Sequence, residues 1–183
     1  MRILLLVSLL SGDLETWLAK GEVTVFENKP DGHLRQVTNI TDIPAPIDAV
    51  WARIVDFDTW STWMPQVAES KVVARTDHAV DVTWSVQAVG PAVKFTGRYE
   101  LDRAHWTVRG VWTDGNLQGS YWDWKLEDLG GKTRLYKTSF VNAVTDNWLL
   151  RQLDDKEHTM EYGINASSGY LEVKALKRSF GGT

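Results

Sequence analysis

The chain has 183 residues, with 20 basic and 24 acidic side chains and a formal net charge of −4. Because no block of Lys and Arg supplies an electrostatic footprint for a phosphate backbone, a nucleic acid is not an expected partner. The absence of cysteine excludes disulfides, thiolate catalysis and Cys-based zinc or iron–sulfur sites.

The N-terminus carries Arg2 and then an apolar run at residues 3–10, after which the sequence turns polar. This order is typical of a secretory signal, which would make the mature protein periplasmic or secreted. An amphipathic helix is the alternative, because apolar residues continue at helical spacing, and the protein would then be cytoplasmic. The run is shorter than the roughly 20 residues of a membrane span. Residues 1–20 are therefore a signal peptide or a helical segment, and residues 21–183 are expected to form one domain.

Eight segments have the composition of β-strands and are separated by turn residues such as Gly, Pro, Asp and Asn. Two of them precede a helical stretch, and six follow it. The predicted strands are residues 22–27, 34–43, 71–76, 80–89, 92–102, 105–113, 120–128 and 133–141. Consecutive strands with short links predict an antiparallel meander.

The helical stretch at residues 42–67 predicts two short helices. Pro46 suits a first helical position and Asp48 the first turn, where the helix dipole favours a negative charge. Apolar residues then recur at helical spacing up to position 55. A second short segment places Trp60 and Trp63 on one face and stops at Pro65.

This pattern of Ala-Pro, an acidic residue, Val-Trp and then W-x-x-W-x-P resembles the START-like (SRPBCC) superfamily of polyketide cyclases, lipid-transfer proteins and coenzyme-Q-binding proteins. The resemblance extends over residues 34–178. It implies an α+β helix-grip fold, in which a curved antiparallel sheet wraps around a long C-terminal helix. In that fold the space between sheet and helix is the ligand cavity.

The C-terminal segment from about residue 147 to 178 has helical periodicity. The apolar residues predicted to share its buried stripe are Leu150, Leu153, Met160, Ile164, Leu171 and Ala175. Gly163 and Gly169 each cost about 1 kcal/mol in a helix interior, so a bend or break is expected there. The glycines could also let the helix pack closely on the sheet or flex as a gate.

Strand alternation separates an aromatic inner face from a polar outer face. The outer face is expected to be solvated and crossed by charge pairs. The inner face, with the helices above it, supplies the predicted ligand-binding residues: Trp60, Trp63, Trp84, Phe95, Tyr99, Trp106, Trp112, Trp122, Trp124, Met160 and Ile164. Gly97 and Gly110 leave this face without side-chain volume, which indicates a bend or room for something else. Together with the rings they predict a pocket of at least a few hundred Å³. The alternative is that the rings simply fill the core.

No nucleophile, zinc, phosphate-loop or dinucleotide motif occurs, and no metal site or cofactor is predicted. The candidates for acid–base chemistry are Tyr99, Lys137 and His158. His158 shares a helical face with Tyr162, and only one of Tyr136 and Lys137 can face the cavity. A lysine inside would suit an anionic head group.

Three functions fit this sequence. The leading one is the binding, or transport, of a hydrophobic small molecule such as a lipid, quinone or polyketide, without covalent chemistry. The second is a polyketide cyclase-like enzyme that uses Tyr99, His158 or Lys137 for proton transfer. The third is a secreted Trp-rich domain that stacks sugars on an exposed aromatic surface. The leading interpretation predicts a monomer without a transmembrane segment and allows transient contact with a membrane.

Overall fold

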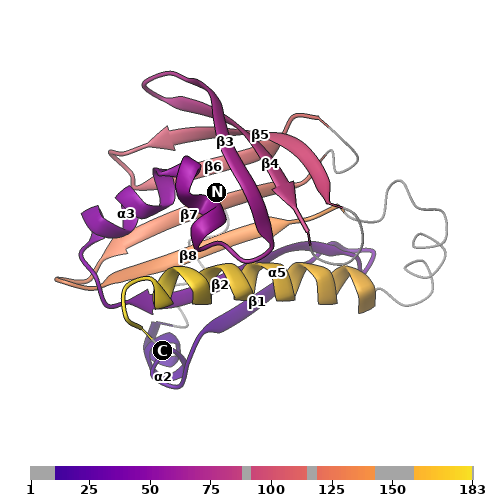
Figure 1. The fold of residues 1–183 in the computed structure, drawn as a ribbon. Coiled ribbons are helices and arrows are strands. Elements are labelled where there is room, and N and C mark those ends of the chain that lie inside the picture. The colour runs from indigo at the N-terminus through magenta and orange to yellow at the C-terminus, as the bar shows by residue number, and fades with distance from the viewer. Residues whose placement is uncertain (1–10, 88–91, 115–118, 143–158, 183) are drawn as a thin grey trace.

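The computed structural model describes residues 11–87, 92–114, 119–142 and 159–182. Within them, eight strands form one antiparallel sheet in the order β1-β2-β8-β7-β6-β5-β4-β3 (Figure 1). The strands are Val23–Asn28 (β1), Leu34–Ile43 (β2), Val67–Arg75 (β3), Ala79–Val86 (β4), Val93–Asp102 (β5), Thr107–Trp112 (β6), Tyr121–Asp128 (β7) and Thr133–Phe140 (β8). All eight predicted strands are confirmed, although β3 starts earlier than the prediction and β6 starts later.

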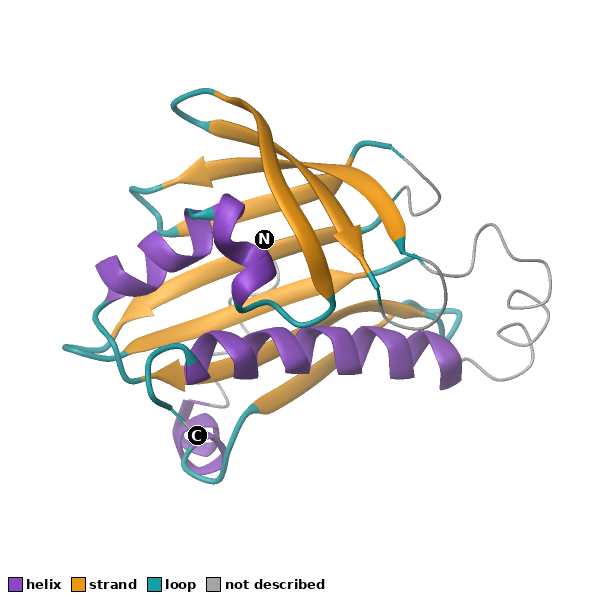
Figure 2. Cartoon of the chain, viewed as in Figure 1, coloured by secondary structure: helices purple, strands orange, loops and turns teal. Residues whose placement is uncertain are grey.

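Three helices of the described residues cover one face of this sheet (Figure 2). The helix α3 (Ile47–Val55) and the 3-10 helix η1 (Phe57–Thr62) lie between β2 and β3 in the chain, and α5 (Thr159–Arg178) follows the last strand. The long helix packs mainly on β2 and β8. This α+β helix-grip arrangement is the fold that the resemblance implied. None of the helices in the described ranges is long and apolar enough to cross a membrane.

The short helix α3 forms as the sequence predicts. Pro46 occupies its N-cap, and Ile47, Val50 and Ile54 are buried on one side. The following turn is fastened to it by Trp60, whose Nε1 donates a hydrogen bond to the carbonyl oxygen of Ile54 at 2.9 Å. The helix pair therefore positions a large aromatic ring over the sheet.

The buried face of α5 is not the predicted one. Leu171 is 41% exposed, Ile164 is half-buried, and the residues that face the sheet include three polar ones. The buried residues are Glu161, Asn165, Gly169, Glu172, Val173 and Leu176. The predicted apolar stripe is therefore wrong in the part of α5 that the structure describes; Leu150 and Leu153, and the side chain of Met160, lie outside it.

The polar residues on this face have partners at the sheet. A Glu161 carboxylate oxygen accepts a hydrogen bond from the backbone N–H of Leu34 at 3.0 Å. The Asn165 side chain accepts one from the N–H of Val141 at 2.6 Å and donates one to its carbonyl oxygen at 3.2 Å. Buried polar groups are tolerated where such hydrogen bonds exist, so the helix is held by contacts that its hydrophobicity does not reveal.

The predicted break at the glycines is also wrong, since α5 continues through Gly163 and Gly169. Gly163 faces open space, but a Cβ at Gly169 would collide with Nδ2 of Asn39 on β2. Gly169 therefore serves close packing, which was the other expected use of these glycines.

We expect Gly163→Ala to raise the free energy of unfolding by about 1 kcal/mol, because alanine has the better helix propensity. Gly169→Ala gains the same propensity, yet we expect it to be destabilising by about 1–3 kcal/mol, because its methyl group overpacks the contact with Asn39. Urea denaturation of both variants measures the difference. Equal stabilisation of the two variants would contradict this packing.

The outer face of the sheet carries charge pairs, as predicted. They include Arg98 with Asp81 at 3.7 Å and Arg109 with Asp123 at 3.4 Å. Burial of Asp123 raises its pKa, although the charge of Arg109 acts in the opposite direction. Exposed pairs of this kind contribute little to stability, so the outer face serves mainly as a hydrated surface.

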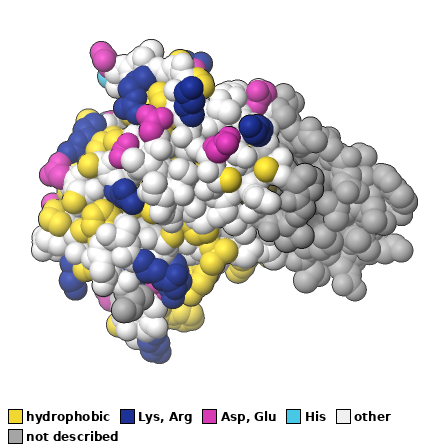
Figure 3. Space-filling view, in the orientation of Figure 1, with side chains coloured by type: hydrophobic (Ala, Val, Ile, Leu, Met, Phe, Trp, Pro, Cys, Tyr) yellow, Lys and Arg dark blue, Asp and Glu magenta, His cyan; other side chains and the backbone are white. Residues whose placement is uncertain are grey.

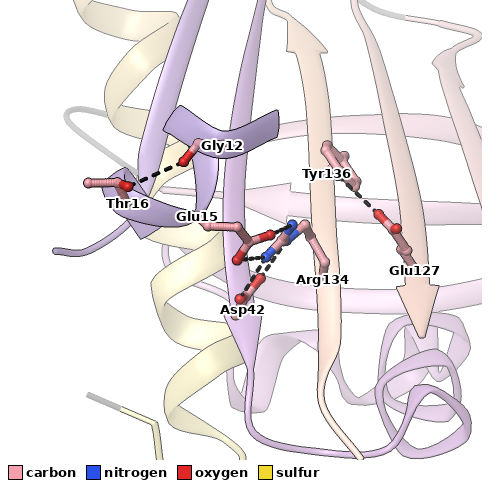
Figure 4. Close-up of polar contacts among 7 residues, drawn as sticks. All are labelled: Gly12, Glu15, Thr16, Asp42, Glu127, Arg134 and Tyr136. Carbon is pink, nitrogen blue, oxygen red and sulfur yellow. Dashed lines mark hydrogen bonds and ion pairs between the residues drawn. The ribbon is translucent and has the colours of Figure 1, made fainter. Parts of the chain in front are cut away.

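One part of the outer face is covered by the helix α2 (Ser11–Leu18). Arg134 of β8 lies beneath it, almost fully buried, and donates hydrogen bonds to both Glu15 and Asp42 at 2.6–3.0 Å (Figure 4). The hydrogen bonds from Arg134 lower the pKa of Glu15 below its ordinary value of 4.5. Residues 11–18 are thus helical, and because the apolar run at residues 1–10 lies outside the described part, the choice between a signal peptide and a helical segment stays a prediction.

This pKa shift predicts a pH dependence. A carboxylate with a lowered pKa in the folded state stabilises the protein above its unfolded pKa, and this contribution disappears as the pH falls through the folded value. Wild type should therefore melt at a higher temperature than Glu15→Gln at pH 7. The difference should shrink as the pH falls below the ordinary value of 4.5 and should vanish once the pH is below the lowered pKa of Glu15. A difference that is constant from pH 7 to pH 3 would contradict the role of the charge.

Candidate functional site

Tyr99 lies at the centre of the concave face, with its side chain fully buried. Its register partner is Gly110 on β6, and Gly97 precedes it by two residues on its own strand. A Cβ at Gly110 would lie 2.6 Å from the Tyr99 ring, and one at Gly97 would lie 3.2 Å from it. The two glycines therefore make room for the tyrosine ring, and the interpretation that they leave open space for a ligand is wrong.

Several aromatic rings pack against Tyr99. Phe57 lies 4.6 Å away between ring centroids, and Trp84 stacks nearly parallel to the tyrosine at 5.9 Å. Of the predicted ligand-binding residues, the structure brings together Trp60, Trp84, Phe95, Tyr99, Trp112, Trp122 and Trp124. We call these residues with Phe57 the aromatic cluster. Phe57 was not among the predicted residues, although its spacing of three from Trp60 is a helical contact distance.

Other predicted residues lie outside this cluster or at its edge. Trp63 is half-buried, contacts Trp60 edge-on at 6.1 Å, and has the guanidinium of Arg53 above it. Trp106 is not in a strand: it has a φ of 55° in the turn before β6 and packs edge-on against Trp51 at 5.8 Å. His158 and the side chain of Met160 are outside the described residues.

The register of β8 decides which of two candidates faces inward. Tyr136 points to the outer face, where its hydroxyl donates a hydrogen bond to Glu127 at 3.0 Å (Figure 4). Lys137 is fully buried on the inner face, with its ammonium 5.6 Å from the ring centroid of Trp124. Its neighbours in the sheet are Trp124 on β7 and Asn39 on β2.

Glu172 of α5 is the charge partner of Lys137. Its Oε2 lies 2.5 Å from Nζ of Lys137, close enough for an ion pair, although the approach lacks hydrogen-bond geometry. The other carboxylate oxygen accepts a hydrogen bond from the Ser168 hydroxyl at 3.2 Å. Glu172 was not among the predicted residues, because the buried face of α5 was expected to carry the apolar ones. The spacing of Glu161, Asn165 and Glu172 at helical intervals was the available signal.

Burial raises the pKa of Tyr99 well above its ordinary value of 10.0, and the negative charge of Glu172 raises it further. Its hydroxyl is therefore uncharged at neutral pH and can donate a hydrogen bond. Several buried side-chain atoms find no hydrogen-bond partner in the described part of the chain. They are Asn39 Nδ2, Trp63 Nε1, Trp84 Nε1, Tyr99 Oη, Trp112 Nε1, Trp124 Nε1, Lys137 Nζ and Ser139 Oγ.

Two depressions lie on the surface of the part of the chain that the structure describes. The larger, of about 980 Å³, is lined by residues that include Trp51, His78 and Arg103. The smaller, of about 380 Å³, is lined by residues of α2, of β1 and of the link between them. Neither lies between the sheet and α5, so the predicted interior pocket stays a prediction. Among the residues described, no group of three or more His, Asp or Glu side chains converges in a way that could hold a metal ion.

Solved structures with the same fold come from several bacteria. The STAR-related lipid transfer protein of Xanthomonas axonopodis superimposes with a TM-score of 0.67 at 18% identity, covering 88% of this chain and 94% of that one. The Zhui aromatase/cyclase of Streptomyces sp. R1128 gives 0.66 at 17% identity, with 81% and 94% covered. The protein TTHA0849 of Thermus thermophilus gives 0.66 at 22% identity, with 78% and 94% covered.

A search of curated proteins finds no match. In contrast, the family model described as polyketide cyclase/dehydrase and lipid transport matches residues 35–147, which is more than half of the chain. The match runs from β2 to the segment beyond β8 and so includes Tyr99 and Lys137. The chain therefore belongs to the polyketide cyclase/dehydrase and lipid transport family of START-like proteins.

Proposed function

We propose that this protein binds a hydrophobic small molecule, such as a lipid, quinone or polyketide, against the aromatic cluster, and that it can carry this molecule. Rings of Trp and Tyr combine an apolar body with one polar tip, which suits sites that are mostly apolar with a few orienting groups. The names of the similar structures, a lipid transfer protein and an aromatase/cyclase, agree with this class of ligand.

The observation that supports this proposal is a set of unpaired donors inside the cluster. Trp84, Trp112 and Trp124 each have a buried indole N–H, and Tyr99 a buried hydroxyl, without a partner among the described residues. A buried donor left unpaired costs about 1–3 kcal/mol, and native proteins contain few of them. Indole N–H groups only donate, so a bound molecule with acceptor oxygens would relieve this cost.

The first test is native mass spectrometry of the purified protein, together with solvent extraction of any molecule that copurifies. Binding of the extracted compound is then measured in Trp124→Phe, which keeps a ring and removes the N–H. We expect affinity to fall about threefold to tenfold, the effect of one neutral hydrogen bond. Trp17→Phe is the control, because Trp17 is 63% exposed on α2. Failure to retain or bind any apolar compound would contradict the proposal.

A cyclase-like enzyme is the second candidate, favoured by the buried Lys137–Glu172 ion pair and its effect on Tyr99. Incubation of the ligand with the protein, followed by mass analysis, separates the two candidates. An unchanged ligand supports binding alone. A change in mass or cyclisation state that is lost in Tyr99→Phe would favour the enzyme, because removal of an acid–base group lowers the rate about 10²–10⁴-fold.

The sugar-binding alternative requires several Trp rings on an exposed surface. Among the tryptophans in the described ranges, Trp17 is the exposed one, and the others are buried or half-buried. This part of the chain therefore offers no aromatic platform for a sugar. Export stays a prediction, and analysis of the N-terminus of protein from its native host would test it.

A further inference from the structure

A second group of buried polar side chains lies beside the aromatic cluster, beneath α5. Asn39 of β2 and Lys137 of β8 are register partners, and Ser139 lies two residues further along the same strand. All three are at least 99% buried, and Glu172 of α5 is 91% buried. Gly169 allows α5 to approach this group closely, because a Cβ at this position would meet the side chains of both Asn39 and Ser139. We call these four side chains the polar cluster: Asn39, Lys137, Ser139 and Glu172.

The polar cluster has no net charge, but it has more hydrogen-bond donors than acceptors to pair with them. The Glu172 carboxylate neutralises the ammonium of Lys137 and also accepts a hydrogen bond from Ser168. Nζ of Lys137, Nδ2 of Asn39 and the hydroxyl of Ser139 have no hydrogen-bond partner in the described part of the chain. An ammonium has three N–H groups, and an amide nitrogen has two, so the cluster can donate several further hydrogen bonds.

We infer that the polar cluster binds the polar end of the ligand, and that this end is an uncharged hydrogen-bond acceptor such as a ketone, quinone or ester carbonyl. The inference rests on the proposed function, because it names the chemistry of the molecule bound beside the aromatic cluster. It replaces the expectation of an anionic head group, which was based on Lys137 alone and did not include the carboxylate of Glu172.

The reason is the balance of charge in a buried site. A carboxylate ligand would bring a second negative charge to a site where Glu172 already neutralises Lys137, and an uncompensated buried charge is strongly unfavourable. A purely hydrocarbon ligand would leave the donors of Asn39 and Ser139 unpaired. A neutral carbonyl accepts these hydrogen bonds and adds no charge.

Three probes of nearly equal size separate these cases: 2-acetylnaphthalene, 2-naphthoate and 2-ethylnaphthalene. Equilibrium dialysis with the full-length protein at pH 7.5 measures their affinities. We expect the ketone to bind about tenfold more tightly than either of the others, which corresponds to one or two hydrogen bonds.

Equal binding of all three would overturn the inference and leave hydrophobic binding intact. Tightest binding of the carboxylate would overturn the inference in favour of an anionic head group. Binding of none would contradict both the inference and the proposed function.

Glu172→Gln changes the charge of the polar cluster at nearly constant shape. The ammonium of Lys137 then has no carboxylate partner, so 2-naphthoate should gain more than about tenfold and become the preferred probe. Glu161→Gln is the matched control, since it removes a buried carboxylate from the same helix about 16 Å away along its axis. The Glu161→Gln variant should prefer the three probes in the same order as wild type. An unchanged preference for the ketone in Glu172→Gln would show that charge balance does not select the ligand.

Discussion

Replacing Lys137 by Met should lower the free energy of unfolding by about 3–5 kcal/mol, although methionine matches the length and apolar stem of lysine. The substitution leaves the carboxylate of Glu172 buried without its counter-charge, since the two groups lie 2.5 Å apart. This loss of stability comes from the uncompensated charge of Glu172 and not from lost packing, because lysine and methionine fill a similar volume against Trp124.

A double substitution separates these two causes. In Lys137→Met/Glu172→Leu neither charge remains, and replacement of a buried ion pair by apolar residues is often neutral or stabilising. We therefore expect the double variant to recover most of the stability that the single one loses, as measured by urea denaturation with a double-mutant cycle. If the two substitutions were additive, or if Lys137→Met cost less than about 1 kcal/mol, the ion pair would not be the source of the effect.

Trp60→Ala should also be strongly destabilising, by about 3–5 kcal/mol. Trp60 is 1% exposed, and its ring contacts Phe57, Trp84 and Tyr99 at centroid distances of 4.6–5.6 Å. It also holds η1 to α3 through its hydrogen bond to Ile54. Alanine would leave a cavity between the helix pair and the sheet, and it would leave the carbonyl of Ile54 without this donor.

Two further substitutions serve as controls for the loss of stability in Trp60→Ala. Trp60→Phe keeps a ring and loses only the indole N–H and some volume, so its cost should be smaller than that of alanine. Trp17→Ala should change the stability by less than about 0.5 kcal/mol, because Trp17 is exposed. Similar losses in Trp60→Ala and Trp17→Ala would contradict the central position of Trp60.

Exposed hydrophobic residues are found on α5 itself. Tyr170 is 38% exposed and Leu171 is 41% exposed, and Figure 3 shows hydrophobic side chains among charged ones on the face of the molecule that carries this helix. Single exposed apolar residues are normal for a folded protein. The helix is nevertheless held to the sheet through Glu161, Asn165 and Glu172, so polar contacts largely decide which of its sides is buried.

The strands, the helix pair and the division of the sheet into two faces could all be predicted from the order of residues. These features follow from short-range rules: an alternation of two in a strand, a period of 3.6 in a helix, and turn residues between them. They are enough to place Trp84, Tyr99 and Trp124 on the inner face, as the structure confirms.

What fills the inner face, and which side of α5 meets it, became clear only in the folded molecule. The gaps at Gly97 and Gly110 are occupied by the Tyr99 ring, and the buried side of α5 carries Glu161 and Glu172. Hydrophobic periodicity assumes that buried residues are apolar, and this assumption fails where a polar side chain finds a partner far along the chain. Glu161 meets the backbone of Leu34, and Glu172 meets Lys137, through contacts that only the folded sheet brings together.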